Sequence, residues 1–145
     1  MKYNKIMINT FDYKNANGYN VIQVWAKQTL QIRDQGRLDS KIDLLERTET
    51  NLLPKLLHTT TKRTKHILHL VINGEVAIRP MLCRGTIDFK NEFTFLFGAT
   101  EKDRKLVPRD APERADDNRE DLILHPRHRC KHERFKKNLE GSVSR

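Results

Sequence analysis

The segment HILHLVINGEVAIRPMLCRGTIDFKNEFTFLFGA, residues 66–99, contains most of the β-strand signal in this chain. Its first two apolar runs are separated by Asn73-Gly74, and an Asn-Gly pair in that position favours a β-hairpin. Three phenylalanines within residues 93–97 occupy alternate positions, which is typical of a strand that buries one face. The segment predicts a three-stranded antiparallel meander, with strands over residues 66–72, 75–83 and 92–99.

Helical periodicity precedes this meander. Apolar residues recur from Tyr19 onward, and Asn20 is a suitable N-cap. Gly36 either ends this helix or lies inside a longer one, at a cost of about 1 kcal/mol relative to alanine. Ser40 is positioned to cap a second helical stretch, which Pro54 is expected to end. After the sheet, residues 111–124 form a third predicted helix, with Asp110 as cap and Pro112 in its first turn.

The order of helices, meander and helix predicts an α+β fold. In this fold the N-terminal helices pack on a small antiparallel β-meander, and a C-terminal helix follows. The length of 145 residues suits one domain. We expect an irregular segment over residues 1–18, a single domain over residues 19–125 and a basic tail over residues 126–145.

The chain contains 28 lysine and arginine residues against 19 acidic residues, which gives a formal net charge of +9 at pH 7. This excess of positive charge favours an anionic partner. The alternative is that each charged side chain is simply solvated by water and binds no partner. No apolar run approaches the roughly 18 residues of a membrane span, and the N-terminus has no apolar stretch like that of a signal peptide. We therefore expect a cytoplasmic protein without a membrane partner.

Several enzyme classes are disfavoured by missing motifs. The sequence contains no P-loop, no dinucleotide-binding glycine pattern, no HExxH and no GxSxG. Cys83 and Cys130 are too few for a disulfide framework, so we expect reduced thiols. The histidines near Cys130 lack the CxxC-like pair that usually holds zinc. We expect neither a metal site nor a cofactor.

Basic residues gather at the ends of the predicted strands and in the adjoining loops. Because a short meander brings such ends together, these residues are able to form one positive face that binds phosphates. The residues expected to bind RNA are Lys62, Arg63, Lys65, Arg84 and Arg104.

Arg79 differs from these because it lies within an apolar strand, between Ile78 and Pro80. Strand alternation places Arg79 on the same face as Met81 and Cys83. We interpret this as the open face of the sheet, a groove for a strand of RNA. Pro80 has no N–H donor, so we expect this strand to lie at an edge or to be bulged there.

The order of these features resembles the RelE/HigB superfamily of toxin-antitoxin ribonucleases, especially its phage-derived HigB-like branch. The resemblance covers about residues 22–122. The chain departs from it in three ways: Pro80 follows the arginine, Glu101 stands where a lysine is usual, and one extra residue lies between Gly98 and Pro108. The corresponding features are the strand arginine (Arg79), the aromatic strand (Phe93 to Phe97), Gly98, the basic turn (Lys102 and Lys105), Pro108, and Ala115 and Arg119 of the last helix.

The resemblance implies metal-independent cleavage of RNA, typically messenger RNA at the ribosome. Arg79 would stabilise the transition state, assisted by Lys102 and Lys105, and an acidic antitoxin protein would cover the basic face. Two alternatives stay open. One is a non-enzymatic nucleic-acid-binding protein of phage or mobile-element origin, and the other is an interaction module whose basic tail docks on an acidic partner.

Overall fold

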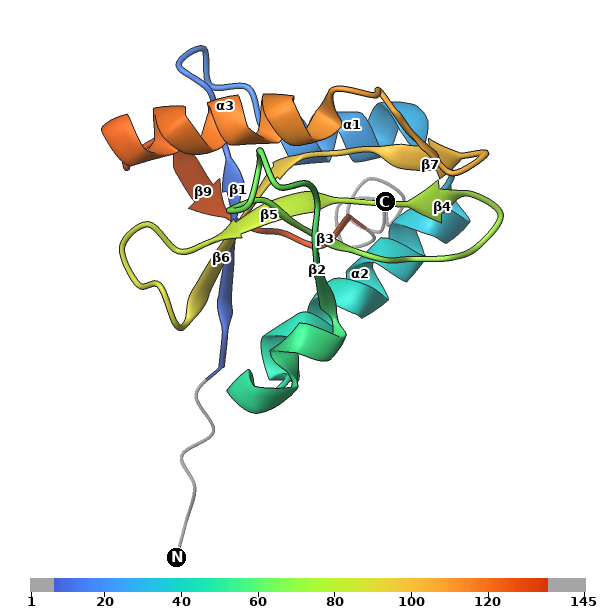
Figure 1. The fold of residues 1–145 in the computed structure, drawn as a ribbon, viewed down its shortest axis with the longest axis horizontal. Helices are drawn as coiled ribbons and strands as arrows, with labels where there is room; N and C mark the ends of the chain where they lie inside the picture. Colours follow the sequence, from blue (N-terminus) through green and yellow to red (C-terminus); the bar gives the residue numbers. More distant parts are fainter. Residues whose placement is uncertain (1–6, 136–145) are drawn as a thin grey trace, which may run out of the picture.

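The computed structural model describes residues 7–135 (Figure 1). Residues 1–6 and 136–145 of the expected terminal segments lie outside the described residues. The elements in chain order are β1 (Asn9–Tyr13), α1 (Val21–Thr29), α2 (Ile32–Arg47), the 3-10 helix η1 (Thr50–Lys55), β2 (Leu57–Thr59), β3 (Leu68–Leu70), β4 (Ala77–Ile78), β5 (Met81–Arg84), β6 (Glu92–Phe97), β7 (Thr100–Lys102), β8 (Lys105–Val107), α3 (Ala111–Leu124) and β9 (Arg129–Lys131).

The main sheet has six strands in the order β2-β3-β5-β6-β1-β9. The pairs β3–β5 and β5–β6 are both antiparallel, so the predicted meander is confirmed. The antiparallel bridge between Ile72 and Ile78 closes the turn around Asn73-Gly74. Strand β4 leaves the meander and joins β7 and β8 in a second sheet. The general α+β class is therefore confirmed.

Both terminal segments contribute strands, which corrects the prediction of an irregular N-terminus and a basic tail. Strand β1, within residues 1–18, lies inside the sheet between β6, to which it is parallel, and β9. Strand β9 follows α3, so the described fold does not end in a helix. Both strands are short and carry polar residues, and their conformation depends on partners that are distant in sequence.

The first predicted helix is confirmed with its cap. The Asn20 side chain accepts a hydrogen bond from the Gln23 backbone N–H at 3.1 Å. The break before α2 falls at Leu30 and Gln31, whereas Gly36 and Ser40 lie inside α2. Of the two alternatives for Gly36, the position inside a helix is therefore confirmed, whereas the prediction that Ser40 caps a helix is wrong. The interior glycine is tolerated because α2 gains stability from its buried apolar face, with Leu38, Ile42 and Leu45.

Helices cover both faces of the main sheet, with α3 above it and α2 below it in Figure 1. On the α2 side, Leu82, Phe93 and Phe95 belong to one core cluster. On the α3 side, Met81 and Cys83 pack in a second cluster with Ala111, Ala115 and Leu122. The prediction that Met81 and Cys83 lie on an open face is therefore wrong, because α3 packs on that face.

Hydrogen bonds and ion pairs connect the residues after α3 to the rest of the domain. His132 Nδ1 lies 2.7 Å from Asp12 Oδ1, and both side chains are buried. Arg129 pairs with Glu92 at 2.9 Å, and Arg134 pairs with Asp43 and Glu46. The Phe135 backbone N–H donates to Asp39. Arg129 and Arg134 thus have carboxylate partners within the chain. Because of these contacts, residues 126–135 belong to the domain.

Candidate functional site

Arg79 is buried, with 8% of its surface exposed. Its Nε donates to Glu101 Oε1 at 3.2 Å, and its Nη1 donates to the Ile78 carbonyl oxygen at 2.9 Å. Its Nη2 donates to Asn73 Oδ1 at 3.3 Å. The prediction that Arg79 is exposed is therefore wrong. The segment between β3 and β5 supplies acceptors for the Arg79 guanidinium, which also connects this segment to Glu101 of β7. Its catalytic role stays a prediction.

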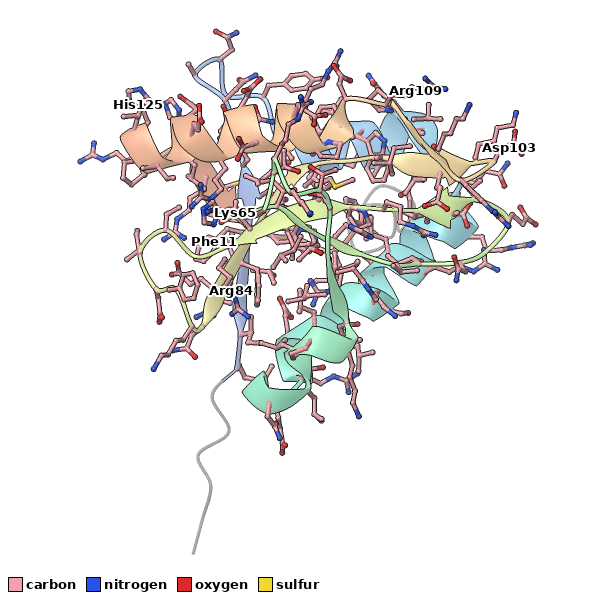
Figure 2. All side chains as sticks on the ribbon, in the orientation of Figure 1. Phe11, Lys65, Arg84, Asp103, Arg109 and His125 are labelled. Carbon is pink, nitrogen blue, oxygen red and sulfur yellow. The ribbon has the colours of Figure 1, made fainter. Side chains whose placement is uncertain are left out.

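Lys102 and Lys105 are exposed and lie directly opposite each other in the β7–β8 hairpin. The two-residue turn between them has positive φ at Asp103 (52°) and Arg104 (65°), as a tight hairpin turn requires. Figure 2 places Asp103 at one end of the molecule and Lys65 with Arg84 toward the other. The structure therefore separates the residues expected to form one basic face.

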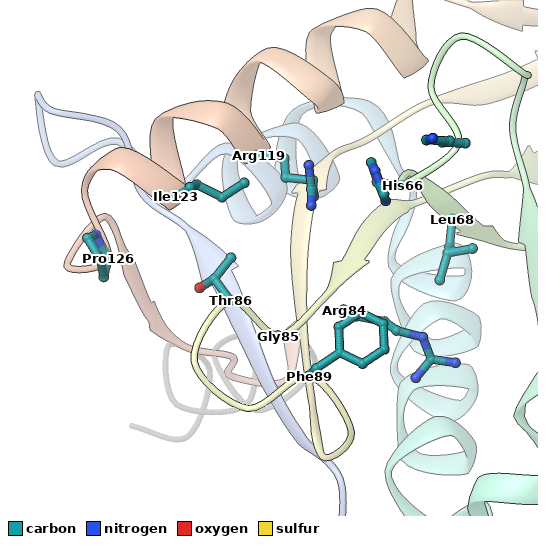
Figure 3. A pocket seen from close by; sticks show the side chains of 10 residues that line it. His66, Leu68, Arg84, Gly85, Thr86, Phe89, Arg119, Ile123 and Pro126 are labelled. Atoms are coloured by element: carbon teal, nitrogen blue, oxygen red, sulfur yellow. The ribbon is translucent and has the colours of Figure 1, made fainter.

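A cavity of about 410 Å³ that is lined by several cations lies beside α3 (Figure 3). It is framed by the loop between β2 and β3, the loop between β5 and β6, and one face of α3. We call this cavity the basic pocket. It is lined by Lys65, His66, Leu68, Arg84, Gly85, Thr86, Phe89, Arg119, Ile123 and Pro126.

The charge of the basic pocket is one-sided. Lys65, Arg84 and Arg119 contribute three cations, and none of the described residues that line the pocket carries a carboxylate. No ion pair joins any of these three to another residue within 7–135. By contrast, Arg63 lies 3.8 Å from Glu113. A concave site with unneutralised positive charge attracts anions.

Aromatic rings orient the Arg84 guanidinium at the end of β5. Its central carbon lies 5.2 Å from the Phe89 ring centroid and 5.4 Å from that of Phe93. Such cation–π contacts hold the planar group without neutralising its charge. The Thr86 hydroxyl is buried and has no hydrogen-bond partner within residues 7–135. The pocket thus offers charged donors and a further polar group to a ligand.

His66 contributes an imidazole to the lining of the basic pocket, whereas the neighbouring thiol of Cys83 is unsuited to ionise. Burial raises the pKa of Cys83 to about 12, and the nearby Arg119 only partly opposes this effect. Imidazole is the side chain that most readily accepts and releases a proton near neutral pH. An anionic substrate held by the arginines would therefore have one general acid–base group beside it.

The prediction from sequence included Lys65 and Arg84 but omitted His66, Phe89 and Arg119 as site residues. His66 resembles any surface histidine in the sequence, and Arg119 belongs to a helix far along the chain. Only the packing of α3 against β5 and β6 brings them together. The helical periodicity of α3 indicates the position of Arg119 only weakly. Arg119 lies one turn after the buried Ala115, on the same side of the helix.

Other polar clusters do not form a metal centre. Within residues 7–135, no group of three or more His, Cys, Asp or Glu side chains is suited to hold a metal ion. His128 instead lies 2.7 Å from Asp121 and stacks on His125.

In the described part of the chain, no helix has the length and apolar character needed to cross a membrane.

Searches of protein-family models, of curated proteins and of solved structures find no match to this chain.

Proposed function

We propose that this protein binds RNA in the basic pocket and cleaves it without a metal ion. The observation that carries the proposal is the convergence of Lys65, Arg84 and Arg119 with His66 in a concave site that no described carboxylate lines. Phosphate diesters are anions, and guanidinium groups bind them with two parallel hydrogen bonds. The single histidine adds a group able to move a proton.

The reaction that fits these groups uses the substrate's own 2′-hydroxyl. His66 accepts the proton as the 2′ oxygen bonds to the adjacent phosphorus. The bond from phosphorus to the 5′ oxygen then breaks, water protonates that leaving oxygen, and His66 releases its proton to the solvent. Arg84 and Arg119 stabilise the negative charge that builds up on the phosphoryl oxygens. The products are a cyclic 2′,3′-phosphate and a 5′-hydroxyl end.

The proposal extends to a RelE/HigB-like toxin that acts on messenger RNA at the ribosome in the cytoplasm. Two helices before the meander β3-β5-β6 and a helix after it support this assignment. The location of Arg119 on α3 also supports it, whereas β9 is a departure. An acidic antitoxin is the partner that the charge of the pocket would require. The hairpin cations Lys102, Arg104 and Lys105 would contact RNA outside the pocket.

A second candidate is a nucleic-acid-binding protein without enzymatic activity. It is favoured by the presence of only one histidine in the pocket, since cleavage needs both an acid and a base. In this case the same arginines bind the backbone, and affinity falls steeply with salt.

Incubation of the purified protein with RNA in excess chelator tests the proposal and separates the two candidates. We expect cleavage to 2′,3′-cyclic phosphate ends, with loss of cleavage in Arg119→Ala. Arg109→Ala is the matched control, because Arg109 precedes α3 at the end away from His125 (Figure 2). Binding without cleavage supports the second candidate. Equal cleavage by both variants contradicts the assignment of the pocket.

A further inference from the structure

The loop between β5 and β6, residues 85–91, exposes an aromatic ring at the basic pocket. Phe89 is 65% exposed, and Ile87 in the same loop is 66% exposed. Single exposed apolar side chains are common and need no explanation. Phe89 differs from Ile87 because it lines the pocket, where Leu68 and Ile123 add further apolar surface.

Hydrogen bonds from backbone N–H groups to side-chain carboxylates stabilise the loop that carries Phe89. Asp88 Oδ1 accepts hydrogen bonds from the backbone N–H groups of Lys90 and Asn91, both at 3.3 Å. Glu92 Oε1 accepts from the Asp88 N–H at 3.3 Å and from Arg129 at 2.9 Å. These contacts connect the two ends of the loop, so we expect binding to Phe89 to require less ordering than in a loop without them.

Gly85 allows the loop to close this tightly. A Cβ at Gly85 would lie 2.2 Å from the Asp88 carbonyl oxygen and 2.5 Å from the Glu92 Cβ. The Gly85 N–H also donates to the Glu92 carbonyl oxygen at 2.7 Å. The exposed Phe89 ring therefore belongs to a tight loop that is held by hydrogen bonds.

The Phe89 ring is largely exposed and lies next to the cations of the pocket. Figure 3 shows the ring face-on, with the Arg84 side chain beside it. A flat apolar surface adjacent to guanidinium groups suits a ligand that joins a planar ring to a phosphate. A nucleotide has this combination, because base and phosphate are carried on one sugar.

We propose that Phe89 is the stacking platform for an unpaired base of the bound RNA, and that it makes the protein select single-stranded over duplex RNA. This inference rests on the proposed function, since it assigns the base that accompanies the phosphate at Arg84 and Arg119. A base inside a duplex is already stacked and paired, so its face reaches Phe89 only after it leaves the helix. An unpaired base avoids that cost.

The test measures dissociation constants for a short RNA in which every 2′-hydroxyl is methylated, which prevents cleavage. The same RNA is measured alone and annealed to its complement. We expect the wild type to prefer the single strand and Phe89→Ala to bind that strand about 10-fold more weakly. Duplex binding should change little. Ile87→Ala is the matched control, and both of its affinities should equal those of the wild type.

Two further variants distinguish stacking from apolar contact. Phe89→Trp should retain the preference, and its indole fluorescence should be quenched by single-stranded RNA. Phe89→Leu keeps an apolar side chain without a π-face and should behave like Phe89→Ala. An unchanged single-strand preference in both Phe89→Ala and Phe89→Leu overturns this inference while the proposed function stands. Absence of RNA binding by the wild type overturns the proposed function itself.

Discussion

The Nε atom of Arg79 lies 3.2 Å from Oε1 of Glu101, and this contact joins the loop after β3 to strand β7. The other donors of the guanidinium bond to carbonyl and amide oxygens of the same loop. Arg79 therefore joins two segments of the fold, whereas Lys65, Arg84 and Arg119 of the basic pocket have no ion-pair partner within residues 7–135.

Replacement of Arg79 by alanine should destabilise the fold. Because buried acceptors lose their donors, we expect the free energy of unfolding to fall by about 2 kcal/mol. Urea denaturation measures this change, with the exposed Arg109→Ala as control. An unaltered free energy of unfolding combined with lost RNA cleavage would instead favour the catalytic role that the sequence predicts for Arg79.

His132→Ala should destabilise the protein by about 3 kcal/mol, through an unpaired polar group and a cavity. His132 contacts Asp12 at 2.7 Å and packs against Phe95 and Phe135. The control is His58→Ala, which removes an exposed imidazole. Thermal unfolding followed by circular dichroism compares the two variants. Equal midpoints would show that the segment after α3 contributes little to stability.

Two glycine substitutions should have opposite effects. A Cβ at Gly98 would lie 1.9 Å from the Trp25 ring, whereas a Cβ at Gly36 meets nothing within 4 Å. We expect Gly98→Ala to cost about 3 kcal/mol through overpacking and Gly36→Ala to gain about 1 kcal/mol through helix propensity. Chemical denaturation monitored by tryptophan fluorescence measures both. A stable Gly98→Ala protein would contradict the close packing of α1 on β6.

Stability should depend on Asp121 in acid. The hydrogen bond from the Tyr13 hydroxyl, followed by the contact with His128, lowers the pKa of Asp121. The unfolded chain therefore binds this proton more readily, so the carboxylate adds stability above its unfolded pKa of about 4. That contribution is lost as the pH falls through the folded pKa. Urea denaturation at several pH values should show the difference between wild type and Asp121→Asn shrinking below about pH 4. A constant difference would contradict this role.

Binding of RNA should depend on the shape of the Arg84 side chain as well as on its charge. A guanidinium stacks on rings and forms paired hydrogen bonds, whereas an ammonium does neither equally well. We expect Arg84→Ala to weaken RNA binding about 10-fold, and Arg84→Lys to recover only part of that loss. Fluorescence anisotropy measures the affinities. The exposed Lys90→Ala in the adjacent loop is the control, and full recovery in Arg84→Lys would show that charge alone matters.

The elements with strong local signals could be predicted from the amino-acid sequence. The Asn20 cap, the apolar positions of α1, the start of α3 at Pro112 and the meander around residues 66–99 all follow from patterns within a few residues. Lys65 and Arg84 were identified for a similar reason, since basic residues at strand ends are visible in the sequence.

The remaining features depend on contacts between segments that are distant in the sequence. Strands β1 and β9 form because distant segments supply their hydrogen-bond partners, and no apolar alternation reveals them. Arg79 is buried because a loop folds back to give it acceptors, which strand alternation does not encode. His66, Phe89 and Arg119 become neighbours through the packing of α3 on the sheet. A local pattern reports the conformation of one segment, whereas a site depends on which segments pack together.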